Sequence, residues 1–299
     1  MSFMLHRVPH YRTDRWLPIL FFSALLIVGL AIHRDYGLSW DDPTQRRLGL
    51  VTYDYIFGKS TDLFANENCY INPFVALLEA LPEKVLQPDN ERDAYSMHHL
   101  ANFIFCWVGL IFFYHLALQL FHDYRFAIIA CIMFVLTPRL FAQCFYNSKD
   151  MTFLFLFVMS VYFTVVWLKR PSWSKMIGIL IFSGILTATR IAGVIFPIIL
   201  FIGMTIGVFS NQLKRKEIWM IAIFLLLYPV AVYIFFPTLW HDSLSKFIKT
   251  LALYSHHPYD VTTFFMGETI HSLKTPWYYI PVWMAIIIPL GWWIFFSLV

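Results

Sequence analysis

Residues 176–210 read MIGILIFSGILTATRIAGVIFPIILFIGMTIGVFS, and this stretch decides the fold class of the chain. Its residues are almost all apolar, and the run is far longer than the roughly 20 residues that one membrane-spanning helix needs. A single charged residue, Arg190, interrupts it near the middle. The stretch therefore predicts two consecutive spans joined by a short connection.

The composition of the whole chain agrees with this interpretation. Hydrophobic residues make up 59% of the 299 positions and aromatic residues 19%. Charged residues make up only 13%, whereas soluble domains carry about 25%. These values predict a polytopic helical membrane protein. The net charge of +4 does not indicate nucleic acid as a partner, because the basic residues lie in short loops between apolar windows.

Hydrophobic windows predict about eight membrane-spanning helices. They lie near 16–33, 98–121, 126–138, 151–168, 175–189, 191–209, 218–236 and 282–299. The first window is followed by further spans, so it does not resemble a cleaved signal peptide. We therefore expect an all-α polytopic membrane protein with a single transmembrane domain over residues 1–299.

The basic loops predict the orientation, because lysine and arginine are enriched in short loops on the cytoplasmic side. They occur before the first span and in every second connection, at Arg7, Arg12, Arg15, Arg125, Lys169, Arg170, Lys175, Lys214, Arg215 and Lys216. We therefore expect a cytoplasmic amino terminus and outer loops at 34–97, 139–150 and 237–281.

The first outer loop is too long to be structureless in an ordinary domain. Asn72-Pro73 is typical of a helix start. Apolar residues then recur at helical spacing, at Phe74, Leu77, Leu78 and Leu81. We expect a short amphipathic helix in the outer membrane interface, broken near Pro82. A soluble minidomain is the alternative.

The same loop begins with an acidic pair, Asp41 and Asp42, in SWDDPTQRRLG (39–49). The pair follows shortly after the first span, where the chain leaves the bilayer. Carboxylates just outside a membrane, in a chain so poor in charge, indicate a polar ligand that meets the lipid surface. This pattern favours chemistry at the membrane face over conduction through it.

The second outer loop, TPRLFAQCFYNSKDMTF (137–153), adds three charged candidates, Arg139, Lys149 and Asp150. An aspartate at the mouth of a span is costly to desolvate unless it is paired or wetted, so Asp150 is a candidate functional residue. Its alternatives are an internal pair with Lys149 or a role at the start of the next helix. Arg190 adds a cation at outer depth, with interfacial snorkelling as the alternative.

The third outer loop is rich in aromatic and ionisable side chains, which suit a sugar site. The best candidate is Glu268. Two doublets, His241-Asp242 and His256-His257, are poor metal chelates, because adjacent residues do not share a face. The aromatic residues of TPWYYIPVW (275–283) fit an interfacial belt equally well.

These motifs together carry a family resemblance. SWDDP, HHLANFIFCWVGLIFFYHLALQLF (98–121), TPRLFAQCFYNSKD, ATRIAG (188–193), PTLWHD (237–242), FMGE (265–268) and TPWYYIPVW occur in an order that resembles the GT-C glycosyltransferases. More narrowly, the chain resembles bacterial relatives of the dolichyl-phosphate-mannose protein mannosyltransferases (glycosyltransferase family 39). The resemblance runs from about residue 35 to residue 290.

The resemblance implies a GT-C-like helical bundle in the bacterial inner (plasma) membrane. It implies an enzyme that moves a sugar from a polyprenyl-phosphate donor to an acceptor (protein, lipid or glycan) on the extracytoplasmic face. Longer relatives carry additional carboxyl-terminal spans and an outer domain, which this chain is expected to lack. A non-catalytic or truncated membrane subunit and a lipid or solute transporter are the alternatives.

The resemblance also implies roles for single residues. Asp41 matches the general base toward the acceptor hydroxyl, and Asp42 stands where many relatives have glutamate. Asp150 matches an acid that supports the site, and Asp42 with Asp150 would hold a divalent metal ion if the reaction uses one. The expected contacts to the lipid phosphate and the sugar are Arg139, Lys149, Arg190 and Glu268.

Overall fold

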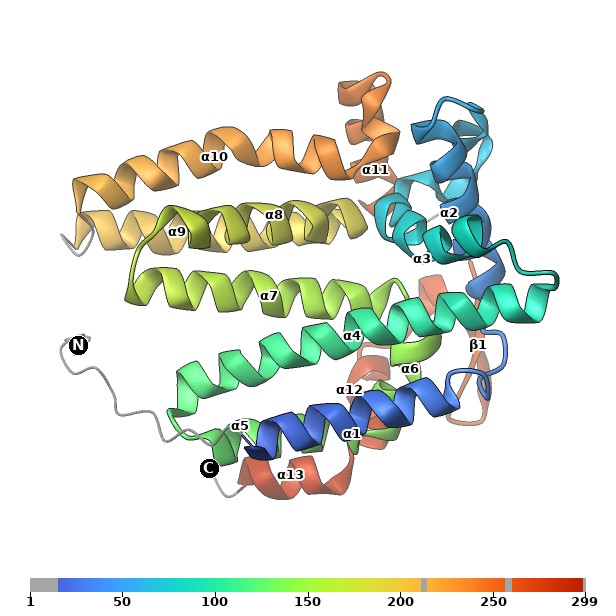
Figure 1. The fold of residues 1–299 in the computed structure, drawn as a ribbon, viewed down its shortest axis with the longest axis horizontal. Helices are drawn as coiled ribbons and strands as arrows, with labels where there is room; N and C mark the ends of the chain where they lie inside the picture. Colours follow the sequence, from blue (N-terminus) through green and yellow to red (C-terminus); the bar gives the residue numbers. More distant parts are fainter. Residues whose placement is uncertain (1–15, 211–213, 256–259, 298–299) are drawn as a thin grey trace.

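The computed structural model describes residues 16–210, 214–255 and 260–297, which are mostly helical (Figure 1). The expected basic residues Arg7, Arg12 and Arg15, as well as His256 and His257, lie outside these ranges. The described helices are α1 (Trp16–Ile32), α2 (Asp42–Ile56), α3 (Pro73–Leu86), α4 (Glu91–Phe121), α5 (Tyr124–Val135), α6 (Pro138–Tyr146), α7 (Asp150–Lys169), α8 (Trp173–Thr189), α9 (Ile195–Phe209), α10 (Arg215–Phe235), α11 (Ser243–Ser255), α12 (Tyr279–Ile287) and α13 (Leu290–Ser297). Short 3₁₀ turns include η3 (Ile191–Val194) and η4 (Pro237–Trp240).

Four helical segments of the described chain are long and apolar enough to cross a membrane. They are α4, α7, the continuous η3–α9 segment and α10, and each coincides with a predicted window. Helices α1 and α8 are also apolar but have only 17 residues each. The helical membrane class predicted from composition is confirmed, whereas the number of eight spans stays a prediction.

Prolines interrupt the helices at two of the predicted spans. The window 126–138 corresponds to α5, which ends before Pro138. Helix α6 then occupies most of the predicted outer segment 139–150, and the α5–α6 pair, bent by 72°, counts at most as one broken span. The bend falls at Thr137, whose extended conformation is the one that the following Pro138 favours. The window 282–299 likewise divides into α12 and α13 at Ile288, which is extended before Pro289.

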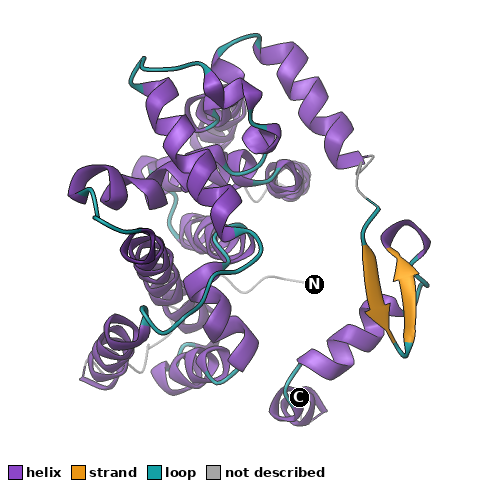
Figure 2. Cartoon of the chain, turned by 90° about the vertical axis from the view of Figure 1, so that its right-hand side faces the viewer, coloured by secondary structure: helices purple, strands orange, loops and turns teal. Residues whose placement is uncertain are grey.

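The polar segments gather at one end of the bundle (Figure 1). Helices α2, α3 and α11 lie at the right-hand end, whereas the α7–α8 connection, with Lys169 and Arg170, lies at the left-hand end. A β-hairpin joins this right-hand group, formed by β1 (Thr262–Phe265) and β2 (Glu268–His271). Figure 2 shows the hairpin standing to one side of the helices. This hairpin was not among the elements expected from the sequence.

The first outer loop contains two helices that pack on each other. Helix α3 begins at Pro73 as predicted, but it runs through Pro82 without the expected break. It contacts α2 closely, since a Cβ on Gly49 would lie 2.2 Å from the Ala76 carbonyl oxygen. A glycine is therefore required where α2 crosses α3. The interfacial position of α3 stays a prediction.

Helix α7 forms the centre of the bundle, between α4 and α8 (Figure 1). On the α4 side, a Cβ on Gly109 would lie 2.3 Å from the ring of Phe155, so the two helices approach closely only because residue 109 is glycine. On the α8 side, Trp167 and Ile179 are fully buried. This core holds the amino-terminal end of α7, and thus Lys149 and Asp150, in a defined place beside α2.

Candidate functional site

The acidic pair lies at the amino-terminal end of α2, and its two carboxylates meet different partners. Asp41 is the N-cap residue, but its side chain makes no capping hydrogen bond to the helix. Its Oδ2 atom instead lies 2.8 Å from Nζ of Lys149, at the start of α7. This ion pair joins the predicted first and second outer loops. The Asp41 side chain is 48% exposed, so its carboxylate stays open to a ligand.

Asp42 is more enclosed and is held in place by the protein. Its Oδ2 atom accepts a hydrogen bond of 2.7 Å from the Ser39 amide and lies 3.2 Å from Nε2 of His99. His99 is buried in α4. These contacts hold the loop between α1 and α2 against α4, and they leave Asp41 as the more accessible carboxylate of the pair.

Asp150 forms a second ion pair, with Arg190. Arg190 lies in the short connection between α8 and η3, so the contact joins two more predicted outer positions. The Asn147 side chain supports the aspartate. Its Nδ2 atom donates to Asp150 Oδ2 at 3.1 Å, and its Oδ1 atom accepts from the backbone N–H of Asp150 at 3.0 Å. The internal Lys149–Asp150 pair, one of the alternatives for these residues, is therefore replaced by two pairs to other elements.

The helix-start alternative for Asp150 remains partly valid. Asp150 is the first residue of α7, where a carboxylate interacts favourably with the helix dipole. Arg190 is not simply directed to solvent, because its Nε atom is buried without a hydrogen-bond partner among the described residues. Tyr254 of α11 lies within electrostatic reach of both side chains, and burial raises the pKa of its hydroxyl. The second pair thus lies near α11, which belongs to the predicted third outer loop.

A buried carboxyl group, Glu79 of α3, lies behind the acidic pair. Burial raises its pKa to about 8; a hydrogen bond with Ser148 opposes this shift and the nearby Asp42 adds to it. Glu79 lines a small cavity of about 10 Å³ together with Asp42, Gln45 and Asn102. Because Ser148 precedes Lys149, Glu79 ties α3 to the loop that supplies the partner of Asp41.

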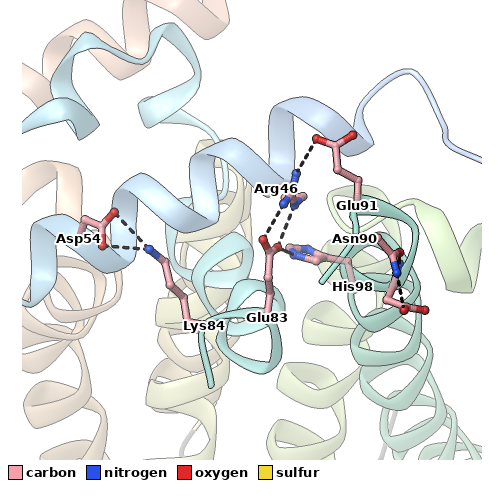
Figure 3. A network of polar contacts seen from close by, with 8 residues as sticks. Arg46, Asp54, Glu83, Lys84, Asn90, Glu91 and His98 are labelled. Atoms are coloured by element: carbon pink, nitrogen blue, oxygen red, sulfur yellow. Dashed lines mark hydrogen bonds and ion pairs between the residues drawn. The ribbon is translucent and has the colours of Figure 1, made fainter. Parts of the chain in front are cut away.

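A charged network orients α2 on its other side (Figure 3). Arg46 donates two hydrogen bonds to Glu83 of α3, at 2.9 and 2.6 Å, and His98 Nε2 lies 2.9 Å from the same carboxylate. Burial alone would raise the pKa of Glu83, but these partners outweigh it, and the pKa lies below its ordinary value. Eight residues after Arg46 on α2, Asp54 accepts hydrogen bonds from Lys84 through both of its carboxylate oxygens. These contacts lock α2 to α3 and α4 and so set the direction in which the acidic pair points.

Two predicted site residues lie elsewhere. Arg139, on α6, lines an apolar cavity of about 400 Å³ with Tyr279, Trp283 and other residues of α12. Glu268, on β2, is exposed and makes no ion pair with another described residue. The structure therefore brings Asp41, Asp42, Lys149, Asp150 and Arg190 into two neighbouring loop junctions, whereas Arg139 and Glu268 show no contact with them.

The described residues contain no group of three or more His, Cys, Asp or Glu side chains able to hold a metal ion. The two proposed metal ligands already have protein partners: Asp42 contacts Ser39 and His99, and Asp150 contacts Arg190 and Asn147. These residues do not fit a preformed metal site, and a metal role for them stays a prediction.

Sequence reasoning missed three residues next to the site, namely Glu79, His99 and Tyr254. Glu79 carried a usable signal, because the buried positions Val75, Ala76 and Ala80 of α3 have helical spacing and place it on the buried face. His99 and Tyr254 carried no such signal, because their partners come from other parts of the chain.

Comparison with known proteins adds no assignment: no family model, no curated protein and no solved structure matches this chain.

Proposed function

We propose that this chain is a membrane glycosyltransferase that moves a sugar from a polyprenyl-phosphate donor to an acceptor hydroxyl, with inversion. The observation that carries the proposal is the contact between Asp41 and Lys149, at 2.8 Å. It places an accessible carboxylate beside a cation at the end of an apolar helical bundle. A lipid-linked sugar phosphate needs such a pair, since its tail belongs in the membrane and its phosphate at the surface.

Asp41 is the proposed general base. The acceptor oxygen bonds to the anomeric carbon as the bond from that carbon to the phosphate oxygen breaks, and the acceptor proton passes to the Asp41 carboxylate. A positioned base typically contributes about a hundredfold to ten-thousandfold to the rate. Attack opposite the phosphate inverts the anomeric configuration. Asp42, enclosed by Ser39 and His99, positions the backbone that carries Asp41.

Lys149 and Arg190 are the proposed phosphate ligands. The leaving phosphate is already acidic, so the reaction needs positive charge there more than a general acid. Both cations are paired with carboxylates, at Asp41 and Asp150. A phosphate that binds Lys149 competes with Asp41 for the ammonium group and so frees the carboxylate to accept a proton. Donor binding and base activation are thereby coupled.

The test is a donor panel with the full chain in liposomes. Wild type and Asp41→Asn are compared on polyprenyl-phosphate sugars, with and without divalent cation, and release of free polyprenyl phosphate is measured. The matched control is Asp54→Asn, because Asp54 also pairs with a lysine of the outer loops but lies further along α2. We expect turnover in wild type and the control, and its loss in Asp41→Asn.

No turnover on any donor, with equal donor binding by all three proteins, would contradict the proposal and favour a non-catalytic membrane subunit. Net movement of the intact lipid across the bilayer without release of sugar would favour a transporter.

A further inference from the structure

We propose that the cavity between residues 33–38 and the start of α4 binds the acceptor, and that this acceptor is a carbohydrate. The inference rests on the proposed transferase function and names the substrate class for one side of the same site. The cavity measures about 470 Å³. That volume lies in the range of small-molecule sites, which run from about 300 to 1,000 Å³.

The lining of this cavity suits hydroxyl groups. Two arginines, Arg34 and Arg92, are balanced by two carboxylates, Asp35 and Glu91, so the side chains present donors and acceptors with little net charge. A sugar hydroxyl both donates and accepts, and it can satisfy either kind of group. Tyr36 and Tyr95 also contribute to the lining, and both combine an aromatic face with a hydroxyl group.

The same lining does not suit the other acceptor classes. Among the described residues that line the cavity, Leu38 has the one aliphatic side chain. The cavity therefore lacks the row of aliphatic side chains that would hold a lipid tail. Extended peptides usually pair with a strand edge or lie in an apolar or aromatic groove. Here the walls are a loop and the first turns of a helix. A polar, largely uncharged glycan is the class that the cavity fits best.

The cavity adjoins the acidic pair through one side chain. His99 lines it, and Nε2 of His99 lies 3.2 Å from Asp42 Oδ2, beside Asp41. The loop wall is also tied to the acidic pair, since the Ser39 amide donates to Asp42. By contrast, the proposed phosphate ligands Lys149 and Arg190 line no part of the cavity. Acceptor and donor phosphate can therefore occupy different places around the acidic pair.

Gly37 offers a clean steric test. It belongs to the lining, and a Cβ built on it meets no atom within 4 Å. Substitution by alanine, leucine and tryptophan therefore adds increasing volume without an initial clash. The matched control is Gly203→Trp, because Gly203 of α9 is also surrounded by open space but lies outside the cavity. Thermal unfolding verifies that each variant folds.

Binding is measured by saturation-transfer NMR on the full chain in nanodiscs, without donor. The probes are neutral di- and trisaccharides of glucose, mannose and galactose, and a serine- and threonine-containing peptide. We expect saturation transfer to sugar protons in wild type and in Gly203→Trp. The signal should decrease through Gly37→Ala and Gly37→Leu and disappear in Gly37→Trp.

Three results would overturn the inference: no sugar signal in wild type, a sugar signal unchanged by Gly37→Leu and Gly37→Trp, or a peptide signal that alone responds to these variants. Because the binding experiment contains no donor, its result does not depend on the result of the Asp41→Asn turnover assay. If the chain cleaves the donor but binds no sugar, the acceptor site is refuted, whereas the proposed transferase function still stands.

Discussion

Lys149 Nζ lies 2.8 Å from Asp41 Oδ2, so the N-cap residues of α7 and α2 form an ion pair at the end of the bundle where α2 and α3 lie. A second ion pair of the same kind, Lys84 with Asp54, lies further along α2 and is also partly exposed. The two pairs differ in their surroundings, because Asp41 adjoins the acidic site and Asp54 does not. This difference allows the functional role of the first pair to be separated from its structural role.

Replacement of Lys149 by alanine should weaken binding of the donor. The substitution removes the cation proposed to bind the lipid phosphate, so KM for the polyprenyl-phosphate sugar should rise in steady-state assays in liposomes. Lys84→Ala is the control, because it removes the lysine of the other pair. Equal donor KM values for wild type and both variants would assign the Asp41–Lys149 pair to structure alone.

Replacement of Glu79 by glutamine should flatten the pH dependence of stability. The folded protein keeps the Glu79 proton up to a pKa of about 8, whereas the ordinary pKa is 4.5. The folded state therefore binds more protons between these values, and Glu79 makes stability fall as pH rises, by about 1.4 kcal/mol per unit. Glutamine cannot ionise, so the variant should lose this decline.

The measurement is thermal unfolding of both proteins from pH 5 to pH 9. The variant should match wild type near pH 5 and melt at a higher temperature near pH 8. Glu91→Gln serves as the control, since the Glu91 side chain is 84% exposed. Parallel pH profiles for wild type and Glu79→Gln would show that Glu79 ionises in the folded protein much as it does in the unfolded chain.

Replacement of Arg46 by alanine should destabilise the protein by roughly 3 kcal/mol, because it leaves the enclosed Glu83 carboxylate without its bidentate partner. Arg46→Lys should recover only part of this loss, since lysine cannot donate in the same forked geometry. The neighbouring Arg47 is exposed, so Arg47→Ala should change stability by less than about 0.5 kcal/mol. Denaturant unfolding measures all three, and similar losses for Arg46→Ala and Arg47→Ala would contradict the role of the network.

Replacement of Gly109 by alanine should separate α4 from α7. The added methyl group would lie 2.3 Å from the Phe155 ring, and such overpacking typically costs about 1–3 kcal/mol. Gly203→Ala meets open space and should not destabilise. Melting temperatures compare the two variants. Unchanged stability in Gly109→Ala would mean that the two helices do not pack this closely.

The sequence predicted the apolar helices well, because a span is a local property of about 20 consecutive residues. The windows 98–121, 151–168, 191–209 and 218–236 correspond to α4, α7, η3–α9 and α10. The predictions failed where local conformation intervenes: Pro138 starts α6, a helix not expected in the predicted outer loop 139–150, and Pro289 divides the window 282–299. The hairpin at residues 262–271 was also missed, although Met266 and Gly267, both with positive φ, are typical of a tight hairpin turn.

The sequence by itself determined that this is a helical membrane protein with its acids and bases at the mouths of its spans. Composition and hydropathy settle that much, because burial in lipid depends on each segment alone. Only the tertiary structure decided which charges meet. Lys149 pairs with Asp41 rather than with its neighbour Asp150, and Asp42 contacts His99 of α4. Periodicity shows which face a helix presents, but the partner on that face depends on how distant helices pack together.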